Sequence, residues 1–322
     1  MRTLKINLLY ACTAKCSHCR FGCTNEGNAE LPDFDTPWTV AKKLKEHFGL
    51  DMAVVLGGEP TICSKDTVAL LQRLSELGIA TRLETNGCWA GSYEEAVAFL
   101  TPLKESGTSI MLSLDGFHDP FIPLQNIVHA VQACVELGMY VNLEMPYLDI
   151  GKKNHPIDRR TMELYRAIQT QIQGSIPIYE GGILFIGRAA EVYGDQFAQG
   201  KGIPTEVCTA VPWWMDSAID STDLLILEPG GYLTKGCGIA IGNVLEQDPI
   251  EMLEQYDARK HPVFSVLMSE GPYGLAKMAQ EQGYRLKQDY ADKCHLCHEA
   301  RQILKPYFDK LLQPNQHYPS FQ

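Results

Sequence analysis

Short apolar runs alternate with longer, amphipathic stretches through the first half of the chain. The runs are KINLLY, MAVVL, ATRLE, SIMLSL, YVNLEM and, after a helix expected at about 158–171, ILFIG. Each has the length of a strand, and strands buried on both faces of a parallel sheet are mostly apolar. The alternation predicts an α/β fold with a parallel sheet.

Glycines divide this region at regular intervals. Gly49, Gly78, Gly107 and Gly138 recur every 29 to 31 residues, and each follows a helix-like stretch and precedes an apolar run. This period fits repeated βα units. Six such units predict a partial (β/α)6, TIM-like barrel, and a doubly wound open sheet is the alternative.

Capping signals indicate where two of the helices begin. Thr36 and Pro37 suit an N-cap and a first helical position. Ser92 and Glu95 have the spacing of a capping box. We therefore expect helices to begin near residues 37 and 93.

The rhythm changes after about residue 190. LLILEPGGYLT, which ends at Thr234, reads as a hairpin with Pro-Gly-Gly at its turn, and the rest is mostly helical. We predict two domains: a barrel core at 1–190 and a small α+β region at 191–322.

Composition and charge narrow the function classes. Of the 322 residues, 45% are hydrophobic, so the chain can bury a sizeable core. The net charge is -11 and no dense Lys/Arg run occurs, which argues against nucleic-acid and anionic membrane partners. The N-terminal apolar run is too short for a signal peptide, and we expect a cytoplasmic protein.

Three of the 11 cysteines follow the first expected strand directly. In a reducing compartment, clustered cysteines indicate metal or iron–sulfur ligation rather than disulfides. Cys12, Cys16 and Cys19 have the spacing CxxxCxxC. Three thiolates can hold a [4Fe–4S] cluster and leave the fourth iron open, although the spacing alone also allows zinc.

A second motif, GGEP, follows the second expected strand. Gly57 and Gly58 let a ligand approach the backbone, and Glu59 offers a carboxylate to an ammonium group. The two motifs together strongly resemble the radical S-adenosylmethionine (radical SAM) superfamily. By this resemblance we expect the whole motif, through Pro60, to contact the bound cofactor.

The resemblance implies a cofactor and a chemistry. In that family the open iron chelates S-adenosylmethionine, and an electron from the cluster cleaves it to a 5′-deoxyadenosyl radical that abstracts hydrogen. By this resemblance, Glu59 binds the amino group of the methionine part of S-adenosylmethionine, and His18 lies beside its adenine. A reducing partner such as flavodoxin or ferredoxin is implied as well.

Further strand-end segments are similar to those of the family. ETNG, SLDG and IGRA follow the third, fourth and sixth expected strands. By this resemblance the ribose or the methionyl carboxylate is contacted by Asn86, Ser113, Asp115 and Arg188.

The later region has its own set of four cysteines, Cys208, Cys237, Cys294 and Cys297. Four thiolates complete either a zinc site or an iron–sulfur cube. The pattern resembles the auxiliary-cluster extension of SPASM and Twitch radical SAM enzymes, which implies a second [4Fe–4S] cluster. With one late CxxC, the shorter Twitch form fits.

The reaction depends on the fate of the substrate radical. Spare cysteines in strand-end loops (Cys23, Cys63 and Cys88) favour an epimerase in which a thiol, here Cys88, returns hydrogen to the opposite face. Cys208 or Cys237 is the donor if it does not bind the cluster. The resemblance is to radical SAM epimerases that act on ribosomal peptides, and a sugar or aminocyclitol is the other substrate class.

Other interpretations stay open. A Twitch-type dehydrogenase or a peptide cross-linking enzyme would share these motifs, and a non-enzymatic iron–sulfur or zinc protein would not need GGEP. Cys134 is expected in the core. The insertion PWWMDS, with Trp213, Trp214 and Asp216, is expected either to line the substrate mouth or to pack the two regions together.

Overall fold

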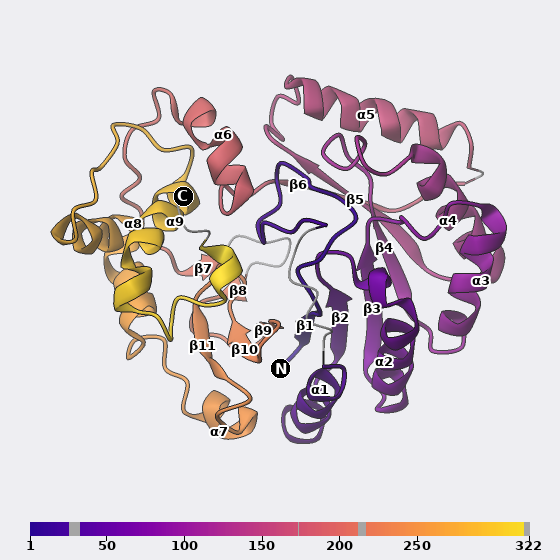
Figure 1. Cartoon of the computed structure of the whole chain (residues 1–322), viewed down its shortest axis with the longest axis horizontal. Coiled ribbons are helices and arrows are strands. Elements are labelled where there is room, and N and C mark those ends of the chain that lie inside the picture. Colours follow the sequence, from indigo (N-terminus) through magenta and orange to yellow (C-terminus); the bar gives the residue numbers. More distant parts are fainter. Residues whose placement is uncertain (26–32, 173, 212–216, 319–322) are drawn as a thin grey trace. The chain divides into compact units, whose positions relative to one another are not determined.

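The computed structural model describes residues 1–25, 33–172, 174–211 and 217–318. The chain divides into two compact units (Figure 1). The barrel unit comprises Arg2–Cys16 and Cys23–Ile183, and the C-terminal unit comprises Met1, Ser17–Gly22 and Leu184–Gln322. The expected boundary at residue 190 differs from this division, and the short segment Ser17–Gly22 belongs with the later part of the chain.

The barrel unit is built on six parallel strands. In chain order they are β1 (Thr3–Asn7), β2 (Met52–Leu56), β3 (Ala80–Thr85), β4 (Ser109–Ser113), β5 (Val141–Tyr147) and β6 (Ile178–Gly182). Each pairs in parallel with the next, and the sheet is not closed. A doubly wound sheet reverses its strand order part-way. The sequential order therefore confirms the partial barrel.

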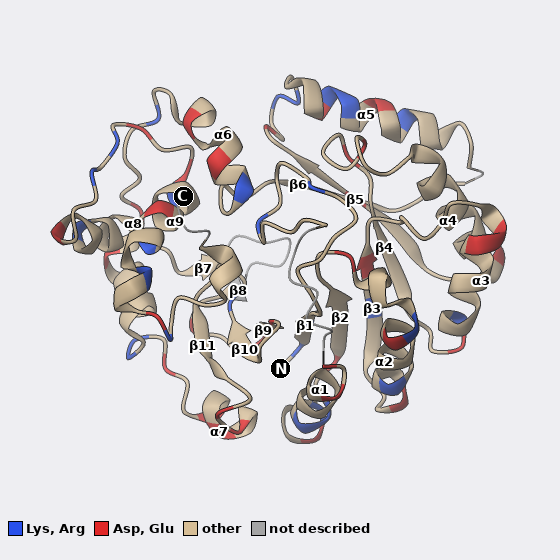
Figure 2. Ribbon diagram, in the orientation of Figure 1, with Lys and Arg blue, Asp and Glu red and all other residues tan. Residues whose placement is uncertain are grey.

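Helices connect these strands. They are α1 (Asp35–Phe48), η1 (Pro60–Cys63), α2 (Ser64–Glu76), α3 (Tyr93–Lys104), α4 (Leu124–Leu137) and α5 (Pro156–Gln169). Figure 1 shows α1 to α5 following the outer side of the strands. Figure 2 shows that the charged residues of this unit lie mainly on the helices. The apolar helix faces are buried, as Leu70, Leu71 and Leu74 of α2 show.

The helix ends agree with most of the capping signals. Ser92 and Glu95 form the predicted capping box at the start of α3. Gly49 and Gly138 end α1 and α4 in the left-handed conformation, with φ of 66° and 69°, where glycine is favoured. The recurring glycines are thus helix ends of βα units.

Thr36 is not the N-cap that the sequence predicts. Helix α1 begins at Asp35, so Thr36 lies inside its first turn. The Asp33 carboxylate accepts hydrogen bonds from the backbone N–H groups of Asp35 and Thr36 and from the Thr36 hydroxyl. Asp33 therefore supplies the acceptor that Thr36 was expected to provide.

The sixth strand is not ILFIG. Strand β6 is Ile178–Gly182, with sequence IYEGG, and it pairs with Leu143–Tyr147 of β5. Most of its residues are exposed, so hydrophobicity does not mark it. Phe185 and Ile186 of the ILFIG run are buried within the C-terminal unit instead.

The C-terminal unit combines a small antiparallel sheet with helices. Strands β9 (Leu224–Leu227) and β10 (Tyr232–Thr234) form the predicted hairpin, and β11 (Ala240–Asn243) pairs with β10. A second pair is β7 (Ala210–Val211) with β8 (Ser217–Ala218). The helices are α6 (Arg188–Ala198), α7 (Pro249–Glu254), α8 (Pro262–Glu281) and α9 (Lys293–Leu304), with η2 (Lys305–Tyr307) and η3 (Asn315–His317).

Helices α8 and α9 pack around the core of this unit. Helix α8 bends at Gly271, whose φ is 67°, just before Pro272. Phe264 and Leu275 of α8 and Leu296 of α9 are fully buried in one apolar cluster. This packing fixes the start of α9, where Cys294 and Cys297 lie.

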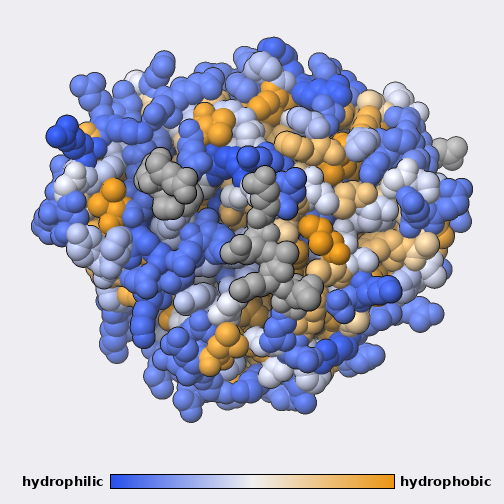
Figure 3. Space-filling view, viewed as in Figure 1, coloured by the Kyte–Doolittle hydropathy of each residue, from blue (hydrophilic) through white to orange (hydrophobic). Residues whose placement is uncertain are grey.

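The face of the molecule in Figure 3 is largely hydrophilic, with hydrophobic residues in small separate groups. Among the described residues, no helix is both long and apolar enough to span a membrane. Trp213, Trp214 and Asp216 of the PWWMDS insertion lie outside the described residues.

Candidate functional site

The GGEP loop packs directly against the chain that follows β1. The backbone N–H groups of Gly58 and Glu59 donate to the carbonyls of Leu9 and Ala11, at 2.6 and 2.9 Å. A Cβ atom on Gly58 would lie 2.0 Å from the Ala11 oxygen. Gly58 is thus required by the protein's own backbone, whereas the sequence suggested that it makes room for a ligand.

Glu59 is fully enclosed by protein donors. Its Oε1 accepts from the backbone N–H of Thr61 (3.1 Å) and from the hydroxyls of Thr61 (2.6 Å) and Thr85 (2.8 Å). Its Oε2 accepts from the backbone N–H of Asn86 (2.8 Å). The side chain is 0% exposed, and burial raises the pKa of its carboxyl group.

The Glu59 carboxylate therefore ties the end of β2 to the end of β3. A carboxylate accepts about four hydrogen bonds, and Glu59 makes four within the chain. Its expected contact with the methionine amino group stays a prediction, and Glu59 would have to exchange one of these partners to make it.

Asn86 connects the end of β3 to the cysteine loop. Its Nδ2 donates to the Thr13 hydroxyl at 3.0 Å and lies 3.8 Å from Cys12 Sγ. Its Oδ1 accepts from the backbone N–H of Cys88 at 3.0 Å. The sequence predicted a ligand contact for Asn86, and the structure gives this side chain protein partners around Cys12.

Cys12 and Cys16 are buried cysteines in the barrel unit. The backbone N–H of Ala14 points to Cys12 Sγ at 3.4 Å. N–H groups directed at sulfur stabilise a thiolate, the form that binds metal. The donor set around Cys12 therefore suits a ligand to iron.

His118 is a neighbour of Cys16 that sequence reasoning missed. Its Nδ1 pairs with Asp115 Oδ2 at 2.7 Å, and Asp115 Oδ1 accepts the backbone N–H groups of Phe117 and His118. Burial opposes protonation of His118, but Asp115 and the Cys16 thiol raise its pKa well above the usual value. The spacing Asp-x-x-His in SLDGFH was the available signal.

Asp115 is thus engaged with His118 rather than open to a ribose, and its 1% exposure agrees. Ser113 is the last residue of β4 and pairs in register with Glu144 of β5. The expected cofactor contacts of both residues stay predictions.

Charged residues also line one face of the sheet. Lys5 Nζ pairs with Glu84 Oε1 at 2.9 Å across β1 and β3. Burial, followed by the charge of Glu84, raises the pKa of Glu144 to about 8, and Lys5 opposes that rise. The side-chain amide of Asn142, two residues earlier on β5, is buried without a hydrogen-bond partner among the described residues. This face is polar, unlike the core behind it.

Cys19 and His18 lie in the C-terminal unit, within Ser17–Gly22. The backbone N–H of Arg188 donates to the Cys19 carbonyl at 3.1 Å, and Arg188 Nη2 donates to the Gly22 carbonyl at 2.8 Å. Arg188 therefore braces the loop after Cys19. Its expected contact with S-adenosylmethionine stays a prediction, as does that of His18.

Comparison with known families finds a match for the N-terminal part of the chain. The model of the radical SAM superfamily matches residues 6–153, which include the three cysteines and the GGEP loop. The chain carries a radical SAM domain.

Solved structures with bound cofactor are similar to this fold. The structure of anSMEcpe with bound AdoMet has 14% sequence identity and a TM-score of 0.52, and the match covers 95% of this chain and 97% of anSMEcpe. The same enzyme with AdoMet and the Kp18Cys peptide has 12% identity and a TM-score of 0.53, with the same coverage. At these identities the likeness is one of fold.

SuiB of Streptococcus suis, bound to S-adenosylmethionine, matches with 16% identity and a TM-score of 0.45, over 83% of this chain and 67% of SuiB. A comparison with curated proteins found no relative of significant similarity. The radical SAM domain implies a [4Fe–4S] cluster and S-adenosylmethionine. Thiolates are the ligands that such a cluster needs, and the assignment of Cys12, Cys16 and Cys19 to it stays a prediction.

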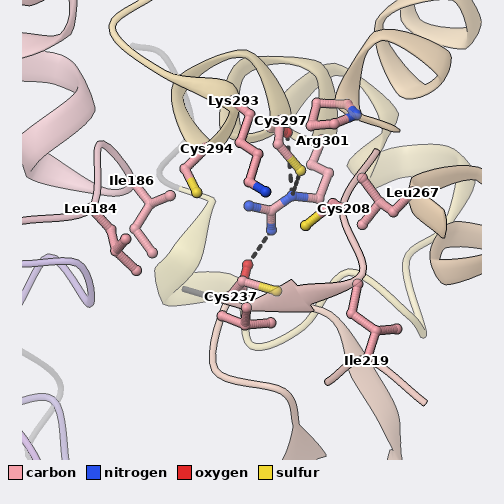
Figure 4. Close-up of a pocket in the computed structure, with 12 residues that line it drawn as sticks. Leu184, Ile186, Cys208, Ile219, Cys237, Leu267, Lys293, Cys294, Cys297 and Arg301 are labelled. Carbon is pink, nitrogen blue, oxygen red and sulfur yellow. Dashed lines mark hydrogen bonds between the residues drawn. The ribbon is translucent and has the colours of Figure 1, made fainter. Parts of the chain in front are cut away.

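The C-terminal unit brings its four cysteines to one pocket. Cys208, Cys237, Cys294 and Cys297 are free thiols that line it together with apolar side chains such as Leu184, Ile186 and Leu267. Figure 4 shows their sulfur atoms directed toward the same space. Burial raises the pKa of Cys208 to about 12, so a bound metal would have to displace its proton. The donor set fits a four-thiolate metal centre.

Two basic residues of α9, Lys293 and Arg301, share that pocket and were missed by sequence reasoning. Arg301 Nε lies 3.3 Å from Cys297 Sγ, and Nη1 donates to the Cys237 carbonyl (Figure 4). The four-residue spacing between Cys297 and Arg301 places both on one side of α9 and was the available signal.

The remaining cysteines differ in their surroundings. Cys134 is buried in α4, and burial raises its pKa to about 12, so it is a core residue as predicted. Cys23 is buried and Cys63 is half-buried. Cys88 is half-buried, with its Sγ 3.6 Å from the Thr61 hydroxyl beside Glu59.

Proposed function

We propose that this protein is a radical SAM enzyme that inverts a carbon centre by hydrogen abstraction and thiol hydrogen donation. When bound at Cys12, Cys16 and Cys19, the cluster with S-adenosylmethionine supplies a 5′-deoxyadenosyl radical, which removes hydrogen from a C–H bond. The chain's own side chains then decide the fate of the substrate radical. A thiol near this site favours hydrogen return over oxidation.

The observation that carries the proposal is the position of Cys88: its backbone N–H donates to Asn86 Oδ1, and Asn86 Nδ2 lies 3.8 Å from Cys12 Sγ. Burial, followed by the negative charge of Glu59, raises the pKa of Cys88, whereas hydrogen bonds with Thr13 and Thr61 lower it. An ordinary cysteine is already mostly a thiol at neutral pH, and the raised pKa of Cys88 acts in the same direction. A hydrogen-atom donor must carry that hydrogen, so Cys88 suits the role and a thiolate would not.

Atoms and electrons balance in this step. The Cys88 S–H bond breaks, the substrate carbon gains that hydrogen on the opposite face, and a thiyl radical remains on Cys88. One electron and one proton then restore the thiol. A one-electron reductant such as flavodoxin or ferredoxin would supply the electron.

We favour a peptide as substrate. The fold is similar to that of anSMEcpe, whose structure with the Kp18Cys peptide shows a peptide on that enzyme. A sugar or aminocyclitol is the other class. The polar sheet face that holds Lys5, Glu84 and Glu144 would suit hydroxyl or ammonium groups of either substrate.

We also propose that Cys208, Cys237, Cys294 and Cys297 hold an auxiliary [4Fe–4S] cluster, as in Twitch-type enzymes. All four thiols face one apolar pocket, which supports a buried centre. Zinc is the alternative with the same ligands.

This cluster gives the second candidate function, a dehydrogenase, in which the substrate radical loses an electron instead of gaining hydrogen. The basic residues Arg301 and Lys293 beside the thiols favour electron uptake and support this candidate.

Solvent deuterium separates the two reactions. Anaerobically reconstituted protein should release 5′-deoxyadenosine with dithionite and S-adenosylmethionine, and Cys12→Ala should abolish that release. Candidate peptides and amino sugars from neighbouring genes would then be treated in D2O. Inversion adds one deuterium per centre, whereas oxidation removes two mass units without deuterium.

Cys88→Ala is the decisive variant. It should still form 5′-deoxyadenosine but lose deuterium uptake and inverted product. Cys63→Ala, also half-buried with a raised pKa, is the matched control and should keep both. Normal deuterium uptake by Cys88→Ala would remove Cys88 from this role.

A further inference from the structure

We infer that Arg301 is a positioning residue that donates a hydrogen bond to the Cys297 thiolate and makes the auxiliary centre easier to reduce. The inference rests on the proposed auxiliary cluster and adds a residue that controls its redox state. Arg301 is 1% exposed and lies one helical turn after Cys297 on α9. No part of it needs to move to reach the sulfur.

The hydrogen bonds of Arg301 hold its guanidinium at the thiols. Nε donates to Cys297 Sγ at 3.3 Å and to the Cys297 carbonyl at 3.2 Å. Nη1 donates to the Cys237 carbonyl and to the Tyr318 hydroxyl, the latter at 2.7 Å. One guanidinium therefore contacts two of the four cysteines. It reaches Cys297 at Sγ and Cys237 at the backbone carbonyl.

A buried guanidinium needs a compensating negative charge. Within the described residues, no carboxylate forms an ion pair with Arg301, and its hydrogen-bond acceptors there are sulfur, two carbonyls and a phenol. An unpaired buried cation is unfavourable in general. Four thiolates around a [4Fe–4S]2+ core carry two net negative charges, which would supply the missing compensation.

Two other cations and one carboxylate lie near the pocket. Lys293 lines it, and Lys235 lies close enough to Cys237 to affect the pKa of that thiol. Asp292, next to Lys293, is the acidic neighbour. Arg301 differs from these charged neighbours because it donates a hydrogen bond directly to the sulfur of a proposed ligand, Cys297 (Figure 4).

The direction of the effect is set by electrostatics. Reduction adds one negative charge to the centre, and a positive charge with an N–H directed at sulfur stabilises the reduced state more than the oxidised one. Arg301 therefore raises the midpoint potential. A residue that only braced α9 against Tyr318 would leave the potential unchanged.

The test uses the full-length chain with Cys12, Cys16 and Cys19 changed to alanine, so that the auxiliary centre alone can hold iron. This protein would be reconstituted anaerobically, and its iron, sulfide and zinc content measured. Its midpoint potential would then be determined by redox titration followed by electron paramagnetic resonance. Arg301→Met removes the charge and the donor at similar volume, and Arg301→Lys keeps the charge but not the planar donor geometry.

We expect Arg301→Met to keep its cluster and to shift the midpoint potential in the negative direction, with a smaller shift for Arg301→Lys. Lys305→Met, at the end of the same helix and paired with Asp309, is the matched control and should leave the potential unchanged. If Arg301→Met fails to fold, the smaller negative shift of the midpoint potential expected for Arg301→Lys still tests the role of Arg301.

The possible outcomes distinguish the two proposals. A protein with zinc or no metal at this pocket would overturn the auxiliary cluster, and the role of Arg301 with it. A cluster that forms normally but keeps the same potential in Arg301→Met would overturn the role of Arg301 alone.

Discussion

The Asn86 side chain donates a hydrogen bond to the Thr13 hydroxyl, 3.0 Å away, and so ties the end of β3 to the loop that carries Cys12. The same side chain accepts the backbone N–H of Cys88. One amide thereby organises the surroundings of a predicted iron ligand and of the predicted hydrogen donor.

Asn86→Ala should therefore lower both stability and iron retention. It leaves the partly buried Cys88 N–H without its acceptor, which costs about 1–2 kcal/mol. Thermal unfolding should show a Tm about 2–8 °C lower, and bound iron should be lost faster after reconstitution. Asn126→Ala, which removes weaker contacts to Gly87 and Cys88, is the control. Equal effects of the two variants would contradict this role for Asn86.

Glu59→Gln should destabilise the protein although it preserves volume. The new amide NH2 would face a donor, because every partner of this carboxylate donates to it. We expect a loss of about 1–3 kcal/mol in the free energy of unfolding, measured by denaturant titration. Glu95→Gln in the exposed capping box of α3 should lose less. A Glu59→Gln protein as stable as the parent would show that the four hydrogen bonds are dispensable.

Gly58→Ala should prevent the GGEP loop from packing against the chain after β1. The added methyl group would lie 2.0 Å from the Ala11 carbonyl, so one backbone must shift. The expected loss is about 2 kcal/mol or more, with reduced soluble yield. Gly182→Ala has its nearest atom at 3.9 Å and should be nearly neutral. Comparable melting of both variants would argue against the close approach.

Glu144 should make stability depend on pH. Its pKa of about 8 lies above the ordinary value of 4.5, so the folded protein binds a proton that the unfolded chain releases between these values. Stability from this group is present at low pH and is lost as pH rises toward 8. Glu144→Gln should flatten the dependence of Tm on pH in that window and raise Tm by a few degrees at pH 8. A parallel pH profile in the variant would disagree with the raised pKa.

Each cysteine set should account for about half of the bound iron. Changing Cys12, Cys16 and Cys19 together to alanine should abolish cleavage of S-adenosylmethionine and leave the auxiliary iron. Changing Cys208 and Cys297 should remove about half of the iron while the other cluster remains. Cys134→Ala, in the core of α4, is the control for cysteine loss. Full iron content after loss of Cys208 and Cys297 would exclude them as ligands.

Local patterns predicted the parts of the fold that depend on local chemistry. The capping box at Ser92 and the helix-ending Gly138 depend on short-range hydrogen bonds and backbone freedom, so they are readable in sequence. Strand β6 is not, because an exposed strand needs no apolar run. Its identity depends on pairing with β5, which is a long-range property.

The same distinction holds for the site. The three-cysteine motif and GGEP are each a short continuous segment of the sequence, so the chemistry of each could be predicted from residue types and spacing. His118 and Arg301 act through neighbours that only packing supplies, namely Cys16 and Cys237. Glu59 belongs to a motif that the sequence identified, but the four hydrogen bonds that its carboxylate accepts could not be predicted from the sequence.

The packing of Ser17–Gly22 has a consequence for biosynthesis. The Phe21 ring lies edge-on to His317, with centroids 5.2 Å apart, and the Cys19 carbonyl accepts from Arg188. The ribosome makes Cys19 early and His317 roughly 300 residues later. The segment with the third cysteine acquires its native contacts only after that delay. A nascent chain that still lacks His317 would therefore offer an incomplete site for cluster delivery, and we expect maturation to wait until that residue has been made.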